Sequence, residues 1–238
     1  MNKTKLKLSI LIPVYNEEKT ISQVLKKVLA VSLPQFKKEL IIVNDGSSDK
    51  TEKYIHNFIQ KSDANIKIYK HEINHGKGAA IRTCIQKATG DILIIQDGDL
   101  ELDPSDYKTI LKPIEEKISN VVFGSRFIGK RHAKIPPHTL FGNIILTKLT
   151  NILYGANLTD MATAYKAFTK DSLKGTKLKT NKFEIDAELT ANLLKNNEKI
   201  YEVPIKYFPR TSKEGKKLRL RDGLSIIYVL LKNRVITS

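Results

Sequence analysis

Cysteine and long apolar runs are nearly missing from this 238-residue sequence. Cys84 is its single cysteine, which excludes a disulfide framework and any metal site built from several thiolates, and predicts a reducing, cytoplasmic setting. The longest apolar run near the C-terminus, residues 224–231, is far shorter than the roughly 20 residues of a membrane-spanning helix. With 12 Gly and 8 Pro, the composition also excludes disordered and collagen-like classes. The chain is therefore expected to fold as a globular protein.

Acidic residues are also scarce, with 25 Asp and Glu against 41 Lys and Arg and a formal net charge of +16. The shortage is uneven, because residues 117–159 contain no acid and residues 206–221 contain only Glu214. Residues 91–106 show the reverse, with six acids and neither Lys nor Arg. Basic stretches suit phosphate groups or an anionic membrane surface. A nucleic-acid partner is not expected, because the acidic stretch would repel a polyanion and no recognised binding motif occurs.

Short apolar runs alternate with segments of helical periodicity through the first half of the chain. Strands are expected at residues 8–13, 40–44, 66–69, 92–96 and 121–123. Helices are expected at residues 21–29, 50–61, 77–88 and 105–118. This alternation predicts an α/β fold with a Rossmann-like, mainly parallel central sheet and helices on both faces. No GxGxxG follows the first strand, which disfavours a dinucleotide-binding protein.

Polar residues follow three of the expected strands, at residues 13–17, 44–49 and 96–101. An Asp-Gly pair alone indicates a turn, but ligands of parallel sheets bind at the carboxyl ends of the strands. Three polar ends on one edge therefore predict a binding site. Within it, Asp97 and Asp99 offer the oxygen ligands that Mg²⁺ or Mn²⁺ prefers.

Eight motifs occur in order along almost the whole chain. They lie at residues 9–17, 43–51, 74–80, 96–104, 124–127, 159–168, 183–189 and 202–211. In this order they resemble the motifs of family 2 glycosyltransferases with the GT-A fold, and are most similar to those of polyprenyl-phosphate (dolichyl-phosphate) mannose or glucose synthases. The resemblance implies one GT-A domain at residues 1–222, with a nucleotide- and metal-binding half at 1–104 and an acceptor half at 105–222. Residues 223–238 would form an amphipathic C-terminal tail.

For activity, the resemblance implies a metal-dependent inverting glycosyltransferase that moves a hexose from a UDP- or GDP-sugar to a polyprenyl phosphate. Mg²⁺ or Mn²⁺ would be the cofactor, and the enzyme would lie peripherally on the cytoplasmic face of a membrane. The alternative is a family 2 enzyme that uses a glycan hydroxyl as the acceptor, in the assembly of a surface polysaccharide or a glycoprotein glycan.

The resemblance also implies roles for single residues. The residues expected around the nucleotide sugar are Pro13, Tyr15, Glu17, Asp45, Lys77 and Asp97. The residues expected to bind the metal are Asp97, Asp99 and Glu101. The residues expected to act in catalysis are Asp99, Asp160 and Arg210. The residues expected at the acceptor phosphate are Arg126, Arg131, His132 and Lys216.

The acceptor decides whether the reaction requires a base. A polyprenyl phosphate is already ionised, so its correct placement by Arg126, Arg131 and His132 would suffice. A sugar hydroxyl would need a general base, for which Asp160 and Asp186 are the candidates. The two cases therefore differ in how strongly transfer depends on these two carboxylates.

Two apolar stripes at helical spacing lie near the basic stretches, at residues 136–154 and 224–231. Such stripes usually pack in the core, but an apolar stripe beside basic residues is also typical of a helix that lies on an anionic membrane. We expect core packing for part of each helix and membrane contact for the rest. Similar enzymes often carry transmembrane segments after the catalytic domain. Because this chain ends before such a segment, a partner membrane protein is a further expectation.

Overall fold

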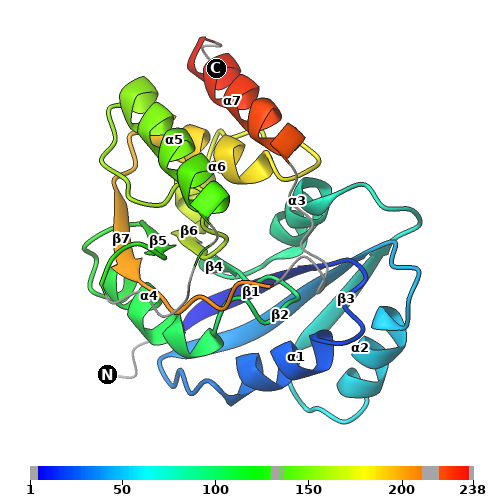
Figure 1. Ribbon diagram of the computed structural model, residues 1–238. Coiled ribbons are helices and arrows are strands. Elements are labelled where there is room, and N and C mark those ends of the chain that lie inside the picture. The colour runs from blue at the N-terminus through cyan, green and yellow to red at the C-terminus, as the bar shows by residue number, and fades with distance from the viewer. Residues whose placement is uncertain (1–4, 130–134, 136, 211–219, 236–238) are drawn as a thin grey trace.

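A β-sheet lies at the centre of the structure. The computed structural model describes residues 5–129, 135, 137–210 and 220–235. These residues form seven strands in the order β3-β2-β1-β4-β6-β5-β7 (Figure 1). The strands are β1 (Leu6–Val14), β2 (Phe36–Asp45), β3 (Ile66–His71), β4 (Ile92–Ile95), β5 (Val121–Ser125), β6 (Lys166–Thr169) and β7 (Ile200–Pro204). Neighbouring strands are parallel, except that β6 runs antiparallel to both β4 and β5. The mainly parallel sheet predicted from the sequence is confirmed.

Helices cover both faces of this sheet. They are α1 (Ile21–Ala30), α2 (Thr51–Ile59), α3 (Lys77–Lys87), α4 (Tyr107–Glu115), α5 (Pro137–Tyr154), α6 (Ile185–Lys195) and α7 (Leu220–Val235). On one face, Ile10 of β1 shares an apolar cluster with side chains of α1, α2 and α4. On the other face, Leu11 of β1 packs with side chains of α3 and α6. Because both faces are buried, successive residues of the strand are apolar, as is typical of central parallel strands.

The helix expected at residues 105–118 is divided in the structure. Residues Pro104–Asp106 form a 3-10 turn, and α4 occupies only Tyr107–Glu115. Lys117 takes a positive φ of 57°, a conformation that an α-helix does not accommodate. The helix therefore ends earlier than the apolar periodicity predicts.

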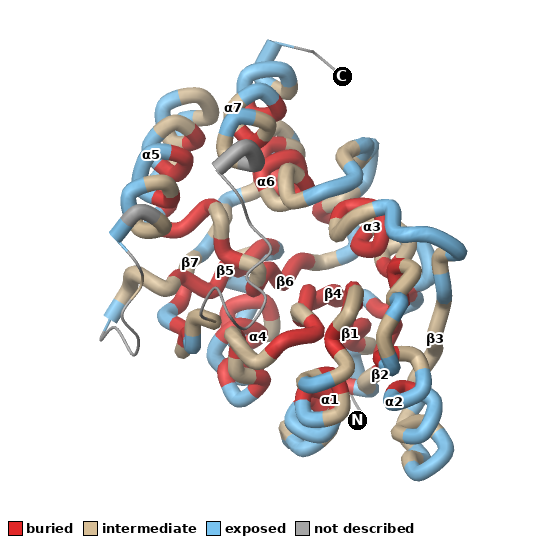
Figure 2. The backbone as a smooth tube through the Cα atoms, turned by 45° about the vertical axis from the view of Figure 1, so that its right-hand side comes forward, coloured by how far each residue is buried: buried red, intermediate tan, exposed pale blue. Residues whose placement is uncertain are grey.

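A third apolar cluster joins α5, α6 and α7. Its buried members include Leu146, Met161, Ala187, Ile226 and Leu230. The opposite sides of α5 and α7 are exposed (Figure 2), so each of these helices packs partly in the core and partly faces solvent. The expected boundary before residue 223 falls inside α7, and the division into two halves and a tail stays a prediction. Among the described helices, none combines the length and the apolar character needed to cross a membrane.

Candidate active site

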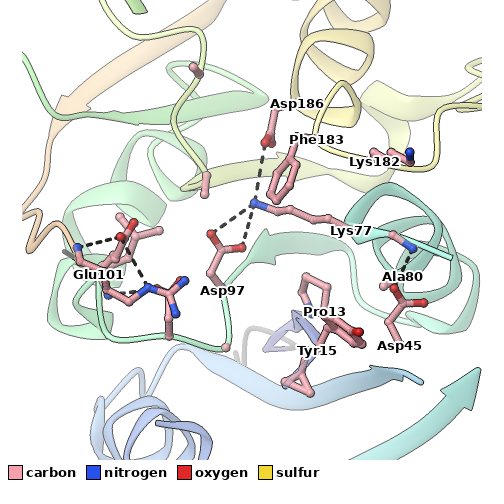
Figure 3. Close-up of a pocket in the computed structure, with 18 of the residues that line it drawn as sticks. Pro13, Tyr15, Asp45, Lys77, Ala80, Asp97, Glu101, Lys182, Phe183 and Asp186 are labelled. Carbon is pink, nitrogen blue, oxygen red and sulfur yellow. Dashed lines mark hydrogen bonds and ion pairs between the residues drawn. The ribbon is translucent and has the colours of Figure 1, made fainter. Parts of the chain in front are cut away.

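A cavity of about 700 Å³ opens at the carboxyl ends of β1, β2 and β4. All the residues that were expected around the nucleotide sugar and the metal line this cavity. These are Pro13, Tyr15, Glu17, Asp45, Lys77, Asp97, Asp99 and Glu101. The opposite wall comes from later parts of the chain and includes Arg126, Asn143, Met161, Asp186, Tyr207 and Arg210. The topology thus brings the two expected halves of the chain together around one cavity (Figure 3).

A row of alternating charges crosses the cavity between these walls. Lys77, at the start of α3, lies 3.0 Å from Asp97 and 3.7 Å from Asp186, measured from Nζ to a carboxylate oxygen (Figure 3). Asp186 in turn lies 3.4 Å from the Nζ of Lys166, which is completely buried. Burial works against the charge of Lys77, but Asp186 and Asp97 outweigh it and raise the pKa of the ammonium. Lys77 is therefore a firmly held cation between the two halves.

Arg210 lies at the acidic side of the cavity, among three carboxylates. Its guanidinium is 3.1 Å from Glu17 and 2.5 Å from Asp99. Its backbone N–H donates a 2.8 Å hydrogen bond to Glu101. Burial, together with the nearby charges of Asp97 and Glu101, raises the pKa of Asp99 to about 7 even though Arg210 opposes the shift. The site therefore carries more negative charge than Arg210 neutralises.

The chemistry of these donors fits a divalent metal ion. Asp99 is only 6% exposed and is crowded by Asp97 and Glu101, so further positive charge would relieve the repulsion. Within the described ranges, no three His, Cys, Asp or Glu side chains form a ready-made metal site. A metal would accordingly be held by one or two carboxylates together with phosphate oxygens of the substrate, which is the usual arrangement for Mg²⁺.

Asp45 holds a loop in addition to lining the cavity. Its carboxylate accepts hydrogen bonds from the Asn74 side chain and from the backbone N–H groups of His75 and Gly76, at 2.7 to 3.1 Å. His71 Nδ1 lies 2.6 Å from it. Gly76 has a φ of 102°, and a Cβ there would lie 2.4 Å from a backbone oxygen, so only glycine fits before α3. The role expected for Asp45 around the nucleotide sugar stays a prediction.

Arg126 and Asp160 form a buried pair at the end of β5. The Nε and Nη2 atoms of Arg126 each donate a 2.7 Å hydrogen bond to Asp160, whose side chain is fully buried. Asp160 lies behind Arg126, which itself lines the cavity. The guanidinium also lies 5.1 Å from the centre of the Tyr207 ring. The other residues expected at the acceptor phosphate, Arg131, His132 and Lys216, fall outside the described residues.

Lys166 and Tyr207 belong to this site but were not among the residues expected from the sequence. Lys166 is buried beneath the cavity, where its ammonium donates to the backbone oxygens of Met161 and Asp186 at 3.0 and 3.1 Å. Tyr207 donates a 3.2 Å hydrogen bond to Glu101. Both residues lie in recognised motifs, at 159–168 and 202–211, and that position was the only available signal.

Known proteins resemble this chain in sequence over most of its length. The family model described as "Glycosyl transferase family 2" matches residues 9–176. A UDP-N-acetylglucosamine–dolichyl-phosphate N-acetylglucosaminyltransferase of Methanococcus voltae is 31% identical over 239 residues, which cover 93% of this chain and 94% of the relative. A dolichyl-phosphate beta-glucosyltransferase of Trichomonas vaginalis is 28% identical over 237 residues, covering 94% of this chain and 72% of the relative.

Solved structures share the same architecture. Glucosyl-3-phosphoglycerate synthase from Mycobacterium tuberculosis, in complex with Mn²⁺, UDP and glucosyl-3-phosphoglycerate, superposes with a TM-score of 0.72. The match covers 98% of this chain and 81% of that chain, at 18% identity. At this identity the likeness shows the fold alone.

Proposed function

Because the chain belongs to glycosyl transferase family 2 and is a glycosyltransferase with the GT-A fold, we propose that it moves a hexose from a UDP- or GDP-sugar to a polyprenyl phosphate. Two relatives whose names contain dolichyl phosphate support this class of acceptor. The cavity supports it as well, since carboxylates gather on one side and Arg126 lies on the other.

The ion pairs of the two candidate bases, Asp160 and Asp186, are the observation on which the proposed acceptor rests. Asp160 is fully buried and gives both its oxygens to Arg126. Burial alone would raise the pKa of Asp186, but Lys77 and Lys166 outweigh it and hold the pKa below its ordinary value. A carboxylate with a low pKa accepts a proton poorly. A phosphate acceptor, which has no proton to give up, fits this arrangement better than a sugar hydroxyl does.

The proposed reaction is a single displacement. A phosphate oxygen of the acceptor attacks C1 of the sugar, the bond from C1 to the donor diphosphate breaks, and the nucleoside diphosphate leaves with the electron pair. No proton has to move, and attack from the opposite face inverts C1, so an α-linked donor gives a β-linked product. Arg126 would hold the attacking phosphate, since guanidinium groups bind phosphate oxygens well.

The residues around Arg210 would handle the leaving group. Asp99 and Glu101 would hold a Mg²⁺ or Mn²⁺ ion which, when bound, adds positive charge that stabilises the departing diphosphate. Arg210 would neutralise further phosphate oxygens from its position beside these carboxylates. Pro13, Tyr15 and Lys77 would border the nucleotide.

The exposed faces of α5 and α7 support work at the surface of an anionic membrane. Their exposed large apolar side chains are Phe141, Ile144, Ile145, Ile152, Leu224, Tyr228, Leu231 and Val235. The basic residues Lys148, Lys232 and Arg234 are exposed on the same two helices. Apolar side chains flanked by Lys and Arg suit the boundary of an anionic bilayer.

The experiment that tests this function compares acceptors that differ only in the phosphate. The full chain is incubated with Mg²⁺ or Mn²⁺, a panel of UDP- and GDP-sugars, and either a short polyprenyl phosphate or the polyprenol of the same length. We expect a lipid-linked sugar from the phosphate alone, and no product after chelation of the metal. Transfer to the polyprenol, with none to the phosphate, would contradict the proposed acceptor.

A further inference from the structure

Several polar side chains of α5 point away from solvent, and they differ in whether the described part of the chain offers them a hydrogen-bond partner. Thr147 accepts a 3.2 Å hydrogen bond from the backbone N–H of Met161. Thr150 donates a 2.9 Å hydrogen bond to the backbone oxygen of Leu146, one turn earlier. Asn151 both donates to and accepts from the backbone of Leu158, at 2.9 Å in each direction. These three side chains are satisfied by the fold itself.

Asn143 lies on the same helix and differs from them. It is only 7% exposed, yet its side-chain amide nitrogen has no hydrogen-bond partner within the described part of the chain. A buried donor without a partner lowers stability, and native proteins keep such groups rarely. Asn143 lines the active-site cavity. The missing partner is therefore expected to be a ligand that enters the cavity.

The neighbours of Asn143 in the cavity indicate what kind of ligand this is. Arg126 lines the same wall of the cavity, to which Leu146, Met161 and Ile226 contribute apolar side chains. Arg126 already directs two of its N–H groups at Asp160, so part of its positive charge is offset. A phosphate bound there requires further hydrogen-bond donors. A neutral amide can supply one among apolar side chains without the desolvation cost of a second cation.

We propose that the side-chain amide of Asn143 donates a hydrogen bond to a non-bridging oxygen of the acceptor phosphate and positions it beside Arg126. The proposal rests on the polyprenyl phosphate acceptor proposed above. Asn143 is then a positioning residue that recognises the phosphate, while the side chains of Leu146, Met161 and Ile226 contact the first carbons of the lipid. The stability cost of an amide without a partner in the described part of the chain is offset when the acceptor binds.

Three variants of the full chain test this role. Asn143→Leu removes the donor at nearly constant volume, and Asn143→Asp keeps the shape but presents a negative charge to the phosphate. Thr150→Val is the matched control, because Thr150 is fully buried two turns further along α5 and is bonded within its own helix. For each variant, KM for a short polyprenyl phosphate, KM for the sugar nucleotide and the melting temperature are measured.

We expect Asn143→Leu to raise the acceptor KM about tenfold, and Asn143→Asp to raise it about a hundredfold. The donor KM should stay within twofold in both variants. Asn143→Leu should melt at the same temperature as the wild type or higher, because an unsatisfied buried group is gone. Thr150→Val should leave both KM values unchanged. A residue with only a structural role would instead lower the melting temperature and leave the acceptor KM alone.

Two outcomes would overturn the proposal, and they differ from each other. If the wild type glycosylates polyprenyl phosphate but Asn143→Leu keeps its acceptor KM, or changes the donor KM instead, the role of Asn143 is wrong and the proposed function stands. If the wild type glycosylates no polyprenyl phosphate while it transfers the sugar to a hydroxyl, the proposed function fails and the role of Asn143 fails with it.

Discussion

Two buried carboxylates lie at opposite ends of the strands, and their surroundings shift their pKa values in opposite directions. Glu39 lies at the amino ends of the strands, here called the amino edge, and Asp99 lies at the carboxyl ends, here called the carboxyl edge. Glu39, near the start of β2, is fully buried, and accepts hydrogen bonds from Ser9 at 2.6 Å and from the Thr89 backbone N–H at 2.7 Å. Lys7 lies 3.2 Å from the same carboxylate. Burial alone would raise the pKa of Glu39, but these hydrogen bonds outweigh it and lower the pKa to about 2. Asp99, beyond the end of β4, has a pKa raised to about 7.

The comparison separates the part of the molecule that supports stability from the part that supports function. At the amino edge, a negative charge is surrounded by donors from the chain itself, so no ligand is needed. At the carboxyl edge, negative charge remains in excess, and we propose that a substrate or an ion completes the site. Perturbed carboxylates of the second kind are typical of functional sites.

The largest expected effect comes from removing the charge at the carboxyl edge. Asp99→Asn should lower the rate of transfer by about 10² to 10³, as expected for the loss of one group that stabilises a leaving charge. The free variant should nevertheless be more stable, because an uncompensated negative charge is gone. We expect a rise in melting temperature of roughly 2–4 °C, equivalent to about 1 kcal/mol in a domain of this size. Initial rates and calorimetry measure the two effects.

Asp103→Asn serves as the matched control for that substitution. Asp103 lies in the same acidic segment, but it accepts a hydrogen bond from the Ser105 backbone N–H and does not line the cavity. Its substitution should leave the transfer rate unchanged and should lower stability slightly. If Asp103→Asn lost as much activity as Asp99→Asn, the transfer rate would depend on the total negative charge of the segment and not on the position of Asp99.

The second prediction concerns the amino edge, where removal of a carboxylate charge should lower stability instead of raising it. Glu39→Gln removes the charge that Lys7 and Lys67 share, and the free energy of unfolding should fall by about 3 kcal/mol. The kcat of the folded variant should remain that of the wild type, since Glu39 lies at the far edge of the sheet from the cavity. Denaturant unfolding at neutral pH tests this, with the exposed Glu72→Gln as the control. A fall in kcat without a fall in stability would contradict the division between the edges.

The last expected effect is a dependence of stability on pH, which has the same origin as the effect of Glu39→Gln. The pKa of Glu39 is lower in the folded protein than the ordinary glutamate value, so the folded state binds fewer protons than the unfolded state does. Its contribution to stability is complete above pH 4.5 and is lost as the pH falls toward 2. Unfolding free energies measured from pH 5 to pH 2 should fall less steeply in Glu39→Gln than in the wild type. Parallel curves would show that other carboxylates cause the acid sensitivity.

The predictable parts of this molecule are those encoded in short, continuous segments. The apolar runs located β1 to β5, and the polar strand ends located Asp97 and Asp99, because parallel strands bring their carboxyl ends to one edge. Lys77 was recognised through its motif. Each of these features depends on residues close together in the sequence.

The residues that could not be predicted have contacts with residues far away in the sequence, or are polar side chains that the fold buries. Lys166 is a lysine that the fold buries completely within β6, and this interrupts the apolar pattern by which a strand is recognised. Glu39 follows two lysines and therefore has the local pattern of a surface residue. Asn143 occurs inside an apolar stripe, where a single polar residue has no clear meaning. Only the tertiary structure shows that its amide has no partner among the described residues.

The place of β6 in the sheet has a consequence for how the chain acquires its fold during synthesis. Strands β1 to β4 all lie within residues 6–95 and pair with one another. Among the described strands, β6 is the one that pairs with both β4 and β5, and it lies at Lys166–Thr169. Strands β1 to β4 can thus assemble while the ribosome is still making the middle of the chain, whereas 40 residues separate the end of β5 from the start of its neighbour β6. Until then the edge of β4 is open, and exposed edges of this kind are where nascent chains aggregate.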